Sequence, residues 1–75
     1  MNRAGRYVTT LVAAGIPADV AAQCWEATER TSAELREQLG RVKSNHARYQ
    51  VTAIAISLLR ARLTALHAQA QKPVN

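Results

Sequence analysis

The chain has 75 residues, of which 48% are hydrophobic, and a formal net charge of +5. This length allows one small domain over residues 1–75 and argues against an enzyme, because a chain of this size buries only about 60% of the surface it exposes when unfolded and has little room for a pocket. Good helix formers dominate, with only three Gly and two Pro, so the composition predicts an all-α fold.

The first predicted element is a short helix over residues 2–14. Tyr7, Leu11 and Ala14 recur at helical spacing along this segment. Gly15 is well placed as the residue just past the end of a helix. We therefore expect a short N-terminal helix that stops at this glycine.

A second helix is predicted over residues 17–40. Pro17 suits the first turn of a helix, and Asp19 favours its positive end. A 4,3 alternation then forms a seam of the kind that faces another helix, and its members are Ala21, Trp25, Thr28, Ser32, Leu35, Leu39 and Val42.

The third predicted helix, over residues 45–71, is the most apolar. Ser44 or Asn45 can cap its start. Its predicted seam consists of Tyr49, Thr52, Ile56, Leu59, Leu63, Leu66 and Ala70, and it is widened by Val51, Ile54, Ala55 and Leu58. These positions cover roughly half of the helix circumference, which one neighbouring helix cannot cover. The second helix covers part of the stripe, and the remainder must meet the first helix or another subunit, so the stripe predicts self-association, with a homodimer expected.

The connection over residues 40–45 leaves two alternatives open. Gly40 costs a helix only about 1 kcal/mol, and no proline enforces a turn, so a single bent helix over residues 18–71 competes with a hairpin. The short connection and the wide stripe favour the hairpin, with two hairpins forming a four-helix bundle. Residues 72–75 are expected to form a disordered tail.

Residue types that carry catalysis or bind metals are sparse. His46 and His67 lie about 30 Å apart on a continuous helix, so they cannot share a site within one chain. Cys24 stands alone and is expected to be a small apolar helix residue in a reduced, cytoplasmic protein, with an intermolecular disulfide as the alternative. We predict a protein without enzymatic activity, metal or cofactor.

The charged residues are segregated along the chain. Residues 19–37 hold every carboxylate side chain and sum to −3, whereas the remaining residues sum to +8 without an acid. Such segregation suits one helix that lies against another of opposite sign, a homo-oligomer that pairs the two, or a surface that meets an acidic partner.

Two functions remain open on these observations. The first is a regulator or inhibitor that binds a partner protein through a helical surface, because Trp, Tyr and Arg are common interface anchors. Its candidate partner-binding residues are Trp25, Tyr49, Arg41, Lys43 and Arg48. The alternative is a homodimeric regulator that binds DNA or RNA through the basic cluster of Arg41, Lys43 and Arg48. Membrane binding is not expected, because the polar face of the third helix is Ala, Gln, Ser and Thr as much as basic.

Overall fold

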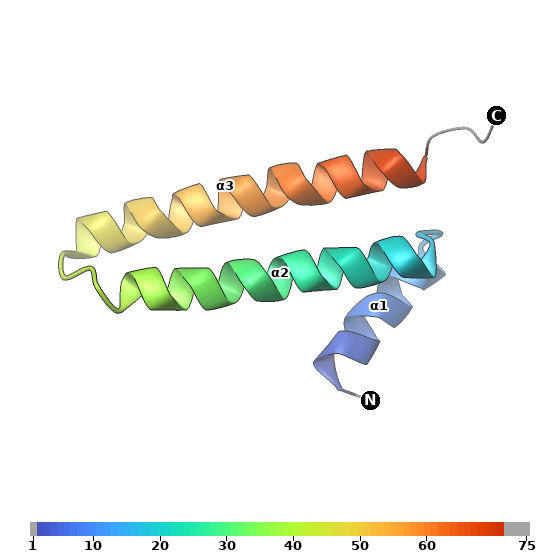
Figure 1. Ribbon diagram of the computed structural model, residues 1–75, viewed down its shortest axis with the longest axis horizontal. Helices are drawn as coiled ribbons and strands as arrows, with labels where there is room; N and C mark the ends of the chain where they lie inside the picture. Colours follow the sequence, from blue (N-terminus) through green and yellow to red (C-terminus); the bar gives the residue numbers. More distant parts are fainter. Residues whose placement is uncertain (1, 72–75) are drawn as a thin grey trace.

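The structure is a computed structural model that describes residues 2–71 and shows three helices over this range (Figure 1). Helix α1 spans Arg3–Ala13, α2 spans Ala18–Leu39 and α3 spans Asn45–Ala70. Helices α2 and α3 lie side by side as an antiparallel hairpin, while α1 packs against α2 near its N-terminal end. The predicted all-α fold with a hairpin is confirmed, and the single bent helix is wrong. The expected tail over 72–75 lies outside the described residues.

Local capping interactions explain where the helices begin and end, within one residue of the predicted bounds. The Asn2 side chain accepts a hydrogen bond from the Gly5 N–H at 2.7 Å and begins α1. Gly15 has a φ of +98°, a conformation that residues with a Cβ rarely adopt, and it reverses the chain after α1. The Ser44 hydroxyl accepts from the Ala47 N–H at 3.0 Å and begins α3.

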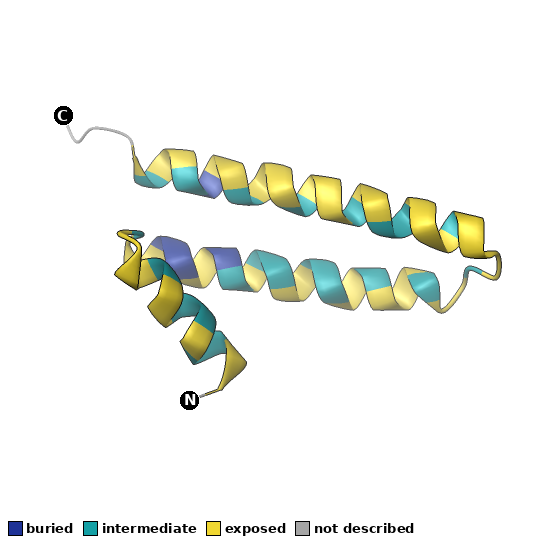
Figure 2. Ribbon diagram, turned by 180° about the vertical axis from the view of Figure 1, so that it is seen from behind, coloured by how far each residue is buried: buried dark blue, intermediate teal, exposed yellow. Residues whose placement is uncertain are grey.

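Buried side chains are few, and they gather at the end of the hairpin where α1 joins it (Figure 2). Val20 and Cys24 of α2 meet Leu66 of α3, and Ala21 is buried beside them. The partly buried residues that pack against this cluster are Tyr7, Leu11, Ile16, Leu63 and Ala70. Cys24 is 0% exposed, so the expectation of an apolar helix residue is confirmed.

The seam of α3 differs from the predicted one, whereas the predicted α2 seam is buried or partly buried at every position. Tyr49 and Ile56 were expected in the α3 seam but are 75% and 51% exposed. Val51 and Ala55 take their place beside Thr52, Leu59, Leu63 and Leu66. Apolar residues cover so much of α3 that several rotations about its axis present an apolar face, and the small Ala55 permits a closer approach to α2 than an isoleucine would.

Away from the end where α1 packs, the hairpin is a single layer formed by α2 and α3 (Figure 1). The Cα extents of the molecule are 49 × 31 × 15 Å, and its radius of gyration is 14.9 Å, where a compact domain of this length has about 11 Å. It exposes 5858 Å², whereas a compact monomer of this mass exposes about 4,500 Å². Domains ordinarily bury their apolar faces between two layers, but the part of the hairpin beyond α1 has no second layer among the described residues.

Candidate interaction surfaces

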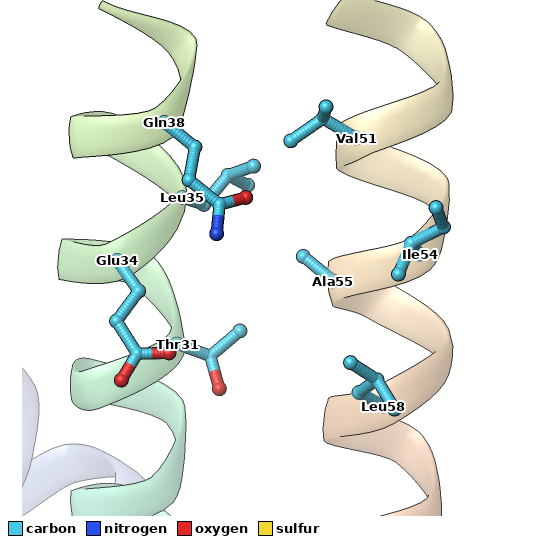
Figure 3. A pocket seen from close by; sticks show the side chains of 8 residues that line it. All are labelled: Thr31, Glu34, Leu35, Gln38, Val51, Ile54, Ala55 and Leu58. Carbon is cyan, nitrogen blue, oxygen red and sulfur yellow. The ribbon is translucent and has the colours of Figure 1, made fainter.

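A groove runs between α2 and α3 on one broad face of the hairpin, and we call this the groove face. It encloses about 170 Å³, and its lining residues are Thr31, Glu34, Leu35, Gln38, Val51, Ile54, Ala55 and Leu58 (Figure 3). Val51 and Ala55 point from α3 toward α2, while Ile54 and Leu58 are 60% and 68% exposed. Two large aliphatic side chains one turn apart thus remain mostly in water.

A second apolar strip follows the other side of α3, and we call it the Tyr49 flank. Shallow hollows along it are lined first by Tyr49, Thr52, Ala53, Ile56 and Ser57, and then by Ile56, Leu59, Arg60, Leu63, Thr64 and His67. Each residue of an α-helix turns by about 100°, so Ile56 and Ile54 face nearly opposite directions. The groove face and the Tyr49 flank are therefore separate surfaces on one helix.

The predicted basic cluster is largely engaged in contacts within the chain. The Arg41 guanidinium forms an ion pair with Glu37 at 2.8 Å. The Arg48 guanidinium donates to the carbonyl oxygens of Leu39 at 2.7 Å and Val42 at 3.4 Å. Of the three predicted phosphate-binding residues, two thus hold the α2–α3 connection together. This role of Arg48 has no signature in the sequence.

Trp25 belongs to a different part of the molecule from Tyr49. Its ring lies against Tyr7 of α1, with ring centroids 5.2 Å apart and planes at 53°. Counted from the connected ends of the two helices, Trp25 lies about 15 Å further along the hairpin axis than Tyr49. The five predicted partner-binding residues therefore do not form one site, and Trp25 instead joins α1 to the hairpin.

Helices α2 and α3 carry opposite net charge. The residues of α2 sum to −3, and those of α3 sum to +3 with no carboxylate. One helix of each sign lies against the other, as the segregated charge suggested. On the groove face, Glu34 lines the α2 side of the groove and Arg62 lies further along α3 beside Ala27 and Arg30 of α2.

The side chains that could bind a metal or take part in catalysis are scattered over the described residues. Between residues 2 and 71, no three His, Cys, Asp or Glu side chains come together in a way that could hold a metal ion. Burial raises the pKa of the Cys24 thiol above its ordinary value, which keeps the thiol protonated. By length and composition alone, α3 would be able to cross a membrane, and it is the one such helix within this range.

Comparisons with protein-family models, with curated proteins and with solved structures gave no match. The two candidate surfaces are therefore defined by the exposure, shape and charge of this chain's own residues.

Proposed function

We propose that the protein is a small non-catalytic regulatory or inhibitory protein that binds a partner protein through the Tyr49 flank. The observation that supports this most directly is Tyr49, an aromatic side chain 75% exposed on the same flank as Ile56. Tyrosine is enriched among the residues that dominate binding energy, because it combines a large apolar ring with a polar tip. Binding there would act by occluding or bridging the partner.

The spacing on this flank suits a helical partner. Tyr49, Ile56 and Leu63 recur every seven residues and form a strip nearly parallel to the helix axis. A partner helix with its own apolar stripe can pack along such a strip, as helices do when they dock into grooves. The partner is accordingly an amphipathic helix.

Charge defines that partner further. Arg60 lines the same flank, and α3 contains no carboxylate to offset its charge. Acidic side chains beside the apolar stripe of a partner helix would meet charge of the opposite sign, which speeds association and disfavours basic partners. We therefore propose an acidic amphipathic helix as the bound element.

Contacts within the chain argue for a protein partner over a nucleic acid. Arg41 and Arg48 already bind Glu37 and the Leu39 carbonyl, so phosphate binding by these arginines would compete with existing interactions. Glu37 offsets the charge of Arg41, which leaves Lys43 and Arg48 of the predicted cluster to supply charge for a phosphate backbone. Affinity for nucleic acid grows with the number of phosphates neutralised, and two cations contribute little.

The test is an affinity capture from the source cells with three forms of the tagged chain. These are the wild type, a Tyr49→Ser/Ile56→Glu double variant, and a Gln50→Glu control at an exposed position of the same helix. The wild type and the control should capture one protein that the double variant loses. With both proteins purified, titration calorimetry should give one partner per protomer and an affinity that falls as salt is added.

Two outcomes would refute this function. One is a partner that binds the double variant with unchanged affinity, because the Tyr49 flank would then have no part in binding. The other is captured material that nuclease treatment releases. That result would favour nucleic-acid binding by the basic residues of the α2–α3 connection. Circular dichroism of the double variant confirms that any loss of binding is not a loss of helix.

A further inference from the structure

We propose that a second copy of the chain covers the groove face. Two hairpins then form a four-helix bundle in which α2 of each copy lies antiparallel across α3 of the other. This inference concerns the face opposite the Tyr49 flank and does not depend on the proposed function.

The surface left open by one copy is large enough for such an interface. The chain exposes 5858 Å², against about 4,500 Å² for a compact monomer of its mass. The difference exceeds the roughly 800 Å² that each partner buries in an interface of standard size. A second hairpin on the groove face would supply the missing second layer and remove Ile54 and Leu58 from water.

Two symmetric ways of stacking the hairpins face to face must be distinguished. When the two-fold axis runs along the helices, α2 of one copy lies across α3 of the other. When the axis runs across the helices, like helices face each other, α2 on α2 and α3 on α3. Both arrangements bury the same face, so its apolar character alone does not choose between them.

Charge selects the first arrangement. Helix α2 carries −3 and α3 carries +3, so stacking like helices would place equal charges against each other on both sides of the bundle. Crossing α2 over α3 brings helices of opposite net charge together, and it places Glu26 of one copy and Arg62 of the other about 20 and 26 Å from the connected ends of their helices. Like charges placed opposite one another at an interface disfavour that pairing.

The two sides of the groove differ in polarity. The α3 side presents the exposed aliphatic residues Ile54 and Leu58, whereas the α2 side presents Thr31, Glu34 and Gln38 beside Leu35 (Figure 3). Crossing α2 over α3 sets the aliphatic side chains of each copy against the mixed surface of the other, which includes Leu35.

The chain offers a matched pair of variants for the test. Ile54 and Ile56 are both exposed isoleucines in the middle of α3, but Ile54 lies on the groove face and Ile56 on the Tyr49 flank. Sedimentation equilibrium at micromolar concentration should give twice the 8.2 kDa chain mass for the wild type and for Ile56→Glu. For Ile54→Glu it should give a single chain, or a chain whose helix melts on dilution because folding is coupled to association.

Charge reversal on α2 tests how the copies are arranged. Glu34→Lys should raise the dimer dissociation constant by about tenfold, because it places a cation against the basic α3 of the second copy. Glu29→Lys, at an exposed position about 140° further around α2, should leave that constant within about twofold. In the arrangement with like helices facing, Glu34→Lys would instead relieve repulsion and tighten the dimer.

Several results would overturn the inference. A wild-type chain that remains a folded monomer at micromolar concentration removes the second copy altogether. A dimer that Ile56→Glu disrupts and Ile54→Glu does not would place the interface on the Tyr49 flank. Co-sedimentation of wild-type chain with phosphatidylglycerol vesicles, abolished by either variant, would assign both faces to a lipid surface. Tighter dimerisation of Glu34→Lys would reject the crossed arrangement.

Discussion

The guanidinium of Arg48, in the first turn of α3, donates a 2.7 Å hydrogen bond to the carbonyl oxygen of Leu39, the last residue of α2. Carbonyl groups at the end of a helix have no partner within that helix and carry the negative end of its dipole. Arg48 therefore supplies both a donor and a positive charge to the C-terminus of α2. The contact joins the two helices of the hairpin directly across their connection.

Removing this contact should destabilise the hairpin. We expect Arg48→Ala to lower the free energy of unfolding by about 1 kcal/mol, because a charge-assisted hydrogen bond is lost at an exposed site. Arg41→Ala is the matched control, since it removes an exposed ion pair to Glu37 and should cost about 0.2 to 0.5 kcal/mol. Urea denaturation followed by circular dichroism at one protein concentration measures both. Equal losses would show that the Leu39 contact has no special role.

The aromatic pair between Tyr7 and Trp25 should control the docking of α1. Replacing Tyr7 by Ala removes a contact with ring centroids 5.2 Å apart, and such pairs contribute about 0.5 to 1.5 kcal/mol beyond the area that they bury. We expect the fluorescence of the single Trp25 to shift to longer wavelength as water reaches the ring, while most of the helical signal remains. Val12→Ala, at an exposed position of α1, should leave the emission unchanged.

Stability should fall at alkaline pH because of Cys24. Burial raises the pKa of this thiol from 9.0, so the unfolded chain loses the thiol proton at lower pH than the folded chain. The resulting stabilisation is complete below the unfolded pKa and is lost as pH rises through the folded pKa. The free energy of unfolding, measured by urea titration above about pH 8, should therefore decline more steeply in the wild type than in Cys24→Ala. Parallel profiles would show that the thiol ionises equally in both states.

The turn after α1 should tolerate only glycine. With a φ of +98° and open space around it, Gly15 is constrained by its backbone and not by its neighbours. Gly15→Ala should therefore lower the thermal midpoint, at a cost of about 1 to 2 kcal/mol. Gly40 has a φ of −65° in the right-handed helical region, so Gly40→Ala should change stability by less than about 0.5 kcal/mol despite a 3.3 Å approach to the Glu37 carbonyl. A similar loss in both variants would contradict this reason.

Local signals in the sequence were sufficient to predict the three helices. Ser44 was expected as a possible cap, Gly15 as the residue beyond the first helix, and the α2 seam from its 4,3 spacing, and the structure has all three. These features succeed because capping, left-handed turns and helical periodicity depend on residues within a few positions of one another. The opposite net charges of α2 and α3 could also be predicted from the sequence, because the net charge of a helix depends only on which residues it contains.

The packing of α2 against α3 decides two features that the sequence pattern did not predict: which face of α3 meets α2, and which atoms Arg48 contacts. Apolar residues cover about half of α3, so the periodicity alone allowed Tyr49 and Ile56 to face α2, and only the packed hairpin turned them outward. In the same way, the sequence placed Arg48 in a basic surface cluster, whereas the hairpin brings its guanidinium to the carbonyl of Leu39, nine residues earlier in the chain. Local spacing sets which residues share a face of a helix, but the rotation of that helix against its neighbours depends on how side chains far apart in the chain fit together.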